Sequence, residues 1–175
     1  MTRGMEFKRA AQLVNLSQQC FPGFPARLIG GNDIIVEAVD GQNAMIGFVI
    51  VHPVVYESGG EFHDWRGYPS SVQQAKQFDI DRAEYEITDV CVGTGSRGQG
   101  IGNTLMTDAI HAISKQHHAY FKGKPAIISL QVFKSNTAAY LLYVKHGFKV
   151  VREAPTQNPF TGKIDADVFL QRKVF

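Results

Sequence analysis

A strand, a glycine-rich turn and a helix follow one another in the segment EITDVCVGTGSRGQGIGNTLMTDAI, from Glu86 to Ile110. Val90 and Val92 alternate as in a half-buried strand, and the apolar residues Ile101, Leu105, Ala109 and Ile113 recur at helical spacing. Three glycines lie in the turn between them: Gly98, Gly100 and Gly102. Because glycine has no Cβ, a ligand can approach this backbone closely, and the free N–H groups and dipole of a helix start favour an anion. The segment therefore predicts a site for a cofactor that carries a diphosphate.

Two common nucleotide motifs explain this turn poorly. The stretch GTGSRG, Gly93 to Gly98, matches the dinucleotide pattern GxGxxG, which also needs an acidic residue about 20 positions further on to bind a ribose. After Asp108 the next acidic residue is Glu153, so an NAD-dependent oxidoreductase is a disfavoured alternative. No Gly-Lys-Ser/Thr closes the turn, which excludes a P-loop.

The same turn fits a third pattern, and a later segment supports it. Arg97, Gly100 and Gly102 form RxxGxG, which resembles the coenzyme A pyrophosphate loop of the GNAT superfamily of N-acetyltransferases. The segment NTAAYLLYVKHGF resembles the second signature of that family, whose residues here are Asn136, Ala139, Leu142, Tyr143, Lys145, Gly147 and Phe148. The resemblance extends from about Ile34 to the C-terminus.

The resemblance implies a fold, a cosubstrate and a set of binding residues. The fold is α+β, with a mostly antiparallel twisted sheet whose parallel fourth and fifth strands splay apart, flanked by helices. The cosubstrate is acetyl-CoA. Its binding residues would be Val90, Cys91, Val92, Arg97, Gly98, Gln99, Gly100, Ile101, Gly102, Asn103, Asn136, Ala139 and Tyr143. Backbone N–H groups near Val90 to Val92 would polarise the thioester carbonyl.

The implied reaction is direct attack of a primary amine on the thioester, which calls for a general base. A lysine-type amine has a pKa of about 10.4, so its deprotonation at pH 7 costs about 4.6 kcal/mol. The spacing of Glu86 before Arg97 resembles that of the family's glutamate base. Strand alternation predicts that Glu86 shares a face with Glu84, Thr88 and Val90, and that Asp89 points to the opposite face. Glu84 or a water chain is the alternative base, and the competing interpretation of Glu86 is a solvent-exposed carboxylate.

The coenzyme A thiolate that leaves is helped by a proton donor. Tyr143 resembles the family's tyrosine acid, with Tyr140 as the alternative donor and core packing as the competing role. The implied reaction requires no metal. His117 and His118 end a helix and have no partner at metal-ligand spacing, so a metal site there is not expected. A lone strand cysteine such as Cys91 is more often a core residue than a nucleophile.

Composition predicts one globular domain over residues 1–175. Hydrophobic residues make up 44% and charged residues 19%, and no window reaches the length of a membrane span, so no membrane association is expected. The net charge of +2 is spread along the chain, which disfavours nucleic acid as a partner. The N-terminus shows no secretory signal, and two cysteines are too few for a disulfide framework. These features predict reduced cysteines and a cytoplasmic location.

The expected elements begin with a helix over Glu6 to Gln19 that buries Phe7, Ala11 and Val14. The family's first strand is short or absent, within Met1 to Met5. The other expected elements are strands at 34–39 and 44–52 around an Asp-Gly turn, a strand ending at Val92, a helix from about 101 to 118, a strand at 126–133, a helix at 136–146, and strands at 148–153 and 167–174.

A long insertion, Glu57 to Ala83, separates the third and fourth strands of the family pattern. It contains Trp65, Phe62, His63 and Tyr68, and a short helix capped by Ser70 or Ser71 is expected. Long loops are often functional, so the insertion is a candidate lid over an organic amine; an aromatic mini-core or a dimer contact explains it equally well.

Three functions remain open: an N-acetyltransferase, a non-catalytic acyl-CoA binding module, and the disfavoured oxidoreductase. The amine acceptor is either a protein or peptide amine or a small-molecule amine, because one fold serves many substrates. The terminal strand is a candidate for pairing with a neighbouring chain's sheet edge in a homodimer.

Overall fold

The computed structural model describes residues 3–24, 29, 32–57, 62–64 and 80–174. Its helices are α1 (Arg3–Cys20), the 3-10 helix η1 (Thr94–Ser96), α3 (Ile101–Phe121) and α4 (Thr137–Lys145). Its strands are β1 (Ile34–Val39), β2 (Met45–Glu57), β3 (Phe62–Asp64), β4 (Ile80–Val92), β5 (Ala126–Phe133), β6 (Lys149–Gln157) and β7 (Ile164–Lys173).

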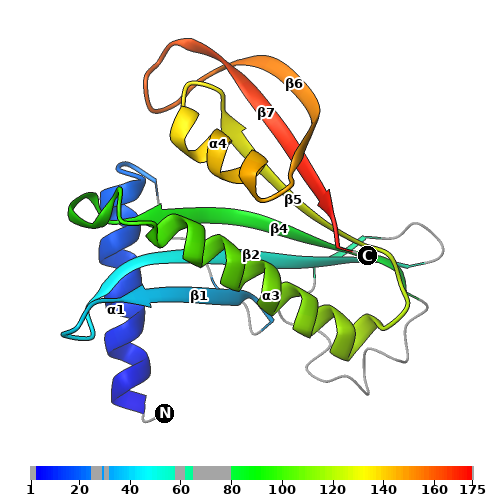
Figure 1. The fold of residues 1–175 in the computed structure, drawn as a ribbon, viewed down its shortest axis with the longest axis horizontal. Helices are drawn as coiled ribbons and strands as arrows, with labels where there is room; N and C mark the ends of the chain where they lie inside the picture. The colour runs from blue at the N-terminus through cyan, green and yellow to red at the C-terminus, as the bar shows by residue number, and fades with distance from the viewer. Residues whose placement is uncertain (1–2, 25–28, 30–31, 58–61, 65–79, 175) are drawn as a thin grey trace.

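The strands form one mixed sheet in the order β1-β2-β4-β5-β7-β6, with β3 paired to β2 (Figure 1). All pairings are antiparallel except that of β4 with β5. Parallel neighbours need a crossover connection, and α3 supplies it here. The predicted α+β fold with a parallel fourth and fifth strand is therefore confirmed.

Two helices cover opposite faces of the sheet. Alternate residues of β2 point to the two faces, so Val49 and Val51 pack in the core beneath α3, whereas Phe48 and Ile50 pack beneath α1. Gly47 allows α3 to approach closely, because a Cβ on this residue would lie 2.9 Å from Leu105 Cδ1.

The first helix differs from its prediction in extent and in face. It begins at Arg3, so residues 3–5 are helical and form no first strand. From Lys8 onward, where burial is described, Leu13 and Leu16 are buried, Val14 is half-buried and Ala11 is exposed. The side chain of Phe7 lies outside the described residues. The prediction was wrong for Ala11, because helical spacing in this polar segment fits more than one stripe of residues, and packing against the sheet selects which stripe is buried.

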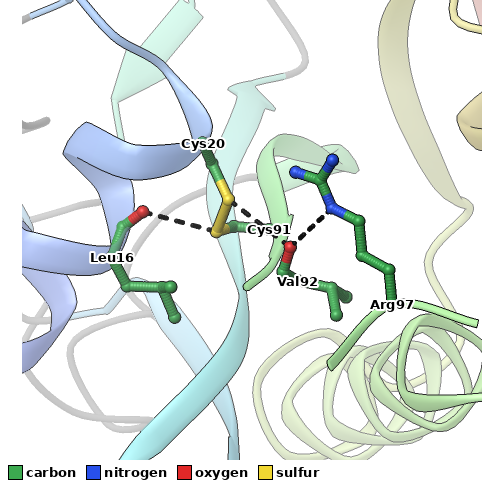
Figure 2. Close-up of a disulfide and its surroundings, with 5 residues drawn as sticks. All are labelled: Leu16, Cys20, Cys91, Val92 and Arg97. Carbon is green, nitrogen blue, oxygen red and sulfur yellow. Dashed lines mark hydrogen bonds between the residues drawn. A yellow bond between two sulfur atoms is a disulfide. The ribbon is translucent and has the colours of Figure 1, made fainter. Parts of the chain in front are cut away.

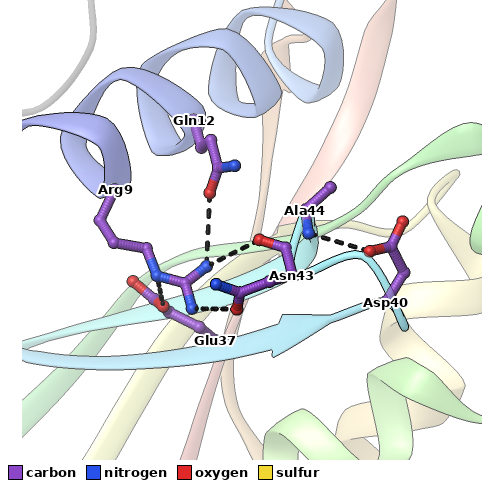
Figure 3. Close-up of polar contacts among 6 residues, drawn as sticks. All are labelled: Arg9, Gln12, Glu37, Asp40, Asn43 and Ala44. Carbon is purple, nitrogen blue, oxygen red and sulfur yellow. Dashed lines mark hydrogen bonds and ion pairs between the residues drawn. The ribbon is translucent and has the colours of Figure 1, made fainter. Parts of the chain in front are cut away.

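Arg9 links α1 to the β1–β2 hairpin through an ion pair and hydrogen bonds (Figure 3). Its Nε lies 3.3 Å from Glu37 Oε2, and its Nη2 donates to Asn43 Oδ1 at 2.9 Å. Asn43 has a φ of 64°. Asp40 Oδ1 accepts the N–H of Ala44 at 2.9 Å, which confirms the predicted Asp-Gly turn.

A disulfide joins Cys20, the last residue of α1, to Cys91 in β4 (Figure 2). The prediction of reduced cysteines was wrong, because the fold brings together two residues that are 71 positions apart in the sequence. Since disulfides are rare in reducing compartments, the bond counts against a cytoplasmic location, which stays a prediction.

Parts of the long insertion belong to the sheet. Phe62–Asp64 form β3, and residues 80–83 begin β4. Trp65, Tyr68 and the expected helix at Ser70 or Ser71 lie outside the described residues, so the lid stays a prediction. Among the described residues, no helix is long and apolar enough to cross a membrane.

Candidate active site

The parallel strands β4 and β5 separate halfway along their length. Their pairing runs from Ala83 with Ala126 to Ile87 with Leu130. Beyond this point β4 continues to Val92 and β5 to Phe133 without pairing to each other. The edge of β4 from Thr88 to Val92 therefore faces a gap in the sheet, where its backbone groups are available to a ligand.

A β-bulge at Thr88 changes which side chains of β4 share a face. Val51 pairs with Ile87 and Ile50 pairs with Asp89, so Thr88 is an extra residue. Directly paired residues share a face, so Asp89 lies with Ile50 on the α1 side, the side that Glu86 also takes. Val90 packs in the α3-side core instead. The predicted alternation was therefore right for Glu84 but wrong for Val90 and Asp89, because a bulge reverses the parity that follows it.

A cavity of about 650 Å³ occupies the gap. It is lined by the end of α1 and the residues after it, by β4 and β5 where they separate, by α4, and by the β6–β7 turn. Five of the predicted site residues line the cavity: Glu86, Val90, Asn136, Ala139 and Tyr143. Its volume lies within the range of about 300–1,000 Å³ that is typical of small-molecule sites.

Tyr143 contributes a buried phenol to this cavity from α4. The residue is 6% exposed, and burial raises the pKa of its hydroxyl to about 12, with a further contribution from the Asp89 carboxylate. The hydroxyl makes no hydrogen bond within the described part of the chain. Tyr140, the alternative donor, does not line the cavity. The hydroxyl of Tyr143 therefore stays protonated at neutral pH and is available to donate a hydrogen bond to a ligand.

Two carboxylates line the cavity from β4. Glu86 is exposed and forms no hydrogen bond or ion pair with other described residues. The alternative base, Glu84, does not line the cavity, and its Oε2 accepts a hydrogen bond from Tyr56 Oη at 3.3 Å. Asp89 is 9% exposed and accepts a hydrogen bond from Thr88 Oγ1 at 2.9 Å. Sequence reasoning missed Asp89, since nothing in the sequence signalled the bulge.

The glycine-rich turn lies at the C-terminal end of β4 and leads into α3. Gly98 and Gly100 have φ values of 78° and 80°, and a Cβ on either would meet no atom within 4 Å. Glycine is thus required there by the backbone angle rather than by space. Arg97 Nε donates to Val92 O at 3.0 Å, which ties the turn to the strand (Figure 2). The remaining predicted cofactor residues, Gln99, Ile101, Gly102 and Asn103, belong to this turn or to the first residues of α3.

Asn136 and His117 take structural roles. Asn136 is the N-cap of α4 and its Oδ1 accepts the N–H of Ala139 at 3.4 Å, so its side chain fixes the helix that carries Tyr143. His117 is buried in the core, where its Nε2 lies 3.0 Å from Lys124 O. Burial lowers the pKa of His117, which favours the neutral ring.

The chain is similar to proteins of known family and structure. The family model of the acetyltransferase (GNAT) domain matches residues 31–150. Similar solved structures include the ribosomal-protein-S18-alanine N-acetyltransferase from Escherichia coli, which is 16% identical with a TM-score of 0.66 over 95% of this chain and 88% of that chain.

Two further structures share the fold. NAA60 from Arabidopsis thaliana, in complex with a bisubstrate analogue, is 18% identical with a TM-score of 0.61 over 93% of this chain and 91% of that chain. A phosphinothricin acetyltransferase from Sinorhizobium meliloti, in complex with AcCoA, is 14% identical with a TM-score of 0.53 over 96% of this chain and 69% of that chain. A search of the curated proteins found no match.

Proposed function

The chain belongs to the acetyltransferase (GNAT) family, and we propose that it transfers an acetyl group from acetyl-CoA to a primary amine by direct attack of the amine on the thioester. The observation that carries this proposal is that Glu86 and the hydroxyl-bearing Tyr143 line one cavity at the gap between β4 and β5. Figure 1 shows β4 and β5 diverging beyond the part over which they pair.

The glycine-rich turn and the first turn of α3 are proposed to bind the pyrophosphate of coenzyme A. The N–H groups at a helix start and its dipole favour an anion, and Gly98 and Gly100 leave the backbone uncovered. The acyl group of bound acetyl-CoA supplies the electrophilic carbonyl. It would lie against the β4 edge from Val90 to Val92, where an N–H group can donate to the developing oxyanion.

The proposed proton movements use the two side chains of the cavity. Glu86 accepts the proton that the amine loses, directly or through a water molecule, as nitrogen bonds to the carbonyl carbon. When the carbon–sulfur bond breaks, Tyr143 donates its hydroxyl proton to the departing thiolate. Both steps are general acid–base catalysis, which contributes typically 10²- to 10⁴-fold.

Glu86→Gln tests the general base through its pH dependence. At pH 7 we expect kcat/KM to fall about 100-fold, because glutamine cannot accept the amine proton. The loss should shrink as the pH approaches the amine pKa of about 10, where the free amine is already abundant. Initial rates of coenzyme A release from pH 7 to 10 measure this. Glu84→Gln is the matched control; a loss of equal size there, or one independent of pH, would contradict the role of Glu86.

Gly100→Ala tests the pyrophosphate loop. A Cβ at a φ of 80° is strained, so we expect the free energy of unfolding to fall by about 1 kcal/mol and the Kd of coenzyme A to rise about tenfold. Gly123→Ala is the matched control, because Gly123 has a φ of 83° but follows α3 far along the chain from the turn. It should lose similar stability and keep the affinity. Calorimetric titration with coenzyme A distinguishes the two, and equal affinities for both variants would argue against the assigned loop.

A further inference from the structure

Three phenylalanine rings from separate parts of the chain meet at the cavity. Phe24 follows α1, Phe133 ends β5, and Phe160 lies in the β6–β7 turn. The ring centroids of Phe24 and Phe160 are 4.9 Å apart, and those of Phe133 and Phe160 are 6.4 Å apart with nearly perpendicular planes. All three residues line the cavity that contains Glu86 and Tyr143. We refer to Phe24, Phe133 and Phe160 as the aromatic cluster.

The cluster is open to solvent although burial of a phenyl ring is favourable. Phe24 is 44% exposed and Phe160 is 49% exposed. Adjacent exposed rings at the wall of a cavity therefore leave apolar surface for a ligand to cover.

The turn that presents Phe160 is held in place by hydrogen bonds. Asn158 is 3% exposed, and its Oδ1 accepts the N–H of Phe160 at 2.9 Å. Its Nδ2 donates to Asp165 Oδ2 at 3.0 Å, which anchors the turn to β7. A turn whose backbone is fixed before binding loses less entropy when a ligand binds. Phe160 thus lies in a preformed wall of the cavity.

The charged side chains of the cavity favour a positively charged group at one end of the ligand. The described residues that line the cavity include two acids, Glu86 and Asp89, and no lysine or arginine. An ammonium group fits beside Glu86, whereas a ligand carboxylate would meet like charge without a cationic partner. The phenyl rings at the other wall suit an apolar group. The cavity therefore favours a positive charge at one end of the ligand and an apolar body at the other.

We propose that the acceptor is a primary amine that bears an aromatic group and no carboxylate, and that the aromatic cluster binds its ring while Glu86 faces its nitrogen. The inference rests on the proposed function, because it places this amine at the cavity where the thioester would react. It goes further by naming the substrate class and three residues that determine specificity.

Acceptor selectivity tests the inference. Rates of coenzyme A release are compared for 2-phenylethylamine, phenylalanine, spermidine and a short peptide with a free N-terminus. We expect kcat/KM for 2-phenylethylamine to exceed that of each other amine at least tenfold. Phenylalanine is the most informative comparison, because it has the same ring and amine together with a carboxylate. Higher kcat/KM for phenylalanine, spermidine or the peptide would overturn the inference and leave the acetyltransferase proposal standing.

Variants separate the cluster from general packing. Phe160→Ala should lower kcat/KM for 2-phenylethylamine about tenfold and leave that of butylamine within about twofold, since a pocket contact of this size is worth about 10- to 200-fold. Phe160→Leu should recover part of the loss. Ile164→Ala is the control, because Ile164 is 75% exposed and does not line the cavity. Equal losses for both amines in Phe160→Ala would contradict a specificity role.

Binding measurements keep this test independent of turnover. Calorimetric titration of 2-phenylethylamine into the protein loaded with coenzyme A should give binding that Phe160→Ala weakens about tenfold. Absence of binding at millimolar amine, while coenzyme A itself binds, would overturn the inference alone. Absence of coenzyme A binding would contradict the proposed function instead.

Discussion

Tyr143→Phe is expected to lower kcat for acetyl transfer about 100-fold while leaving the Kd of acetyl-CoA within about threefold. The variant removes one hydroxyl from a side chain that is 6% exposed, so the packing of the ring against Phe148, whose centroid lies 6.2 Å away, is retained. Without the hydroxyl, the departing thiolate must take its proton from water. Steady-state rates with saturating amine, together with calorimetric titration of acetyl-CoA, measure the two quantities separately.

Tyr140→Phe is the matched control for this prediction. It makes the same chemical change on the same helix, at a residue that does not line the cavity. We expect its kcat to stay within about twofold of the unmodified protein. The proton-donor role of Tyr143 would be contradicted if both variants kept full activity, or if Tyr143→Phe lost acetyl-CoA affinity in proportion to its rate.

Reduction of the Cys20–Cys91 disulfide is expected to lower the free energy of unfolding by about 4 kcal/mol. Closing a loop between residues 71 positions apart removes conformational entropy from the unfolded chain, and the chain-entropy relation gives a value of this size. Urea unfolding with and without a reductant measures the effect. The Cys20→Ala/Cys91→Ala double variant should resemble the reduced protein and be indifferent to reductant.

The same bond should affect the amine more than the cofactor. Cys20 ends α1, and Ser17, Phe21 and Phe24 nearby line the cavity. Cys91 Sγ also lies 3.6 Å from Leu16 O, a contact that ties β4 to α1 (Figure 2). We expect reduction to raise KM for the amine about threefold or more while the Kd of coenzyme A changes little. Unchanged stability in the reductant would show that the bond does not constrain the chain.

The elements predicted most accurately are those whose ends are marked by local sequence features, such as a capping residue or a glycine. The strand at 126–133 and the helix after Asn136 were placed within one residue, since Asn136 supplies an N-cap and Gly147 a φ of 81° beyond the helix end. Features that depend on tertiary contacts were not predicted. The Thr88 bulge, the disulfide, the buried face of α1 and the aromatic cluster each depend on residues far apart in the sequence.

Only part of the candidate site was therefore predicted from the sequence. Motif spacing located Glu86 and Tyr143, which the fold brings to one cavity although they are far apart in the sequence. Asp89 and the aromatic cluster were not predicted, because a single-residue bulge and the meeting of three segments that are distant in the sequence leave no periodic pattern. The catalytic roles of Glu86 and Tyr143 stay predictions until the variants are measured.

The most direct test of the central claim is the release of coenzyme A from acetyl-CoA by the purified, oxidised protein, with and without a primary amine, followed by mass analysis of the amine. We predict that release depends on the amine, that the amine gains one acetyl group, and that Tyr143→Phe slows both equally. If no amine accelerates release, and coenzyme A at high concentration fails to raise the melting temperature, the acetyltransferase account is contradicted.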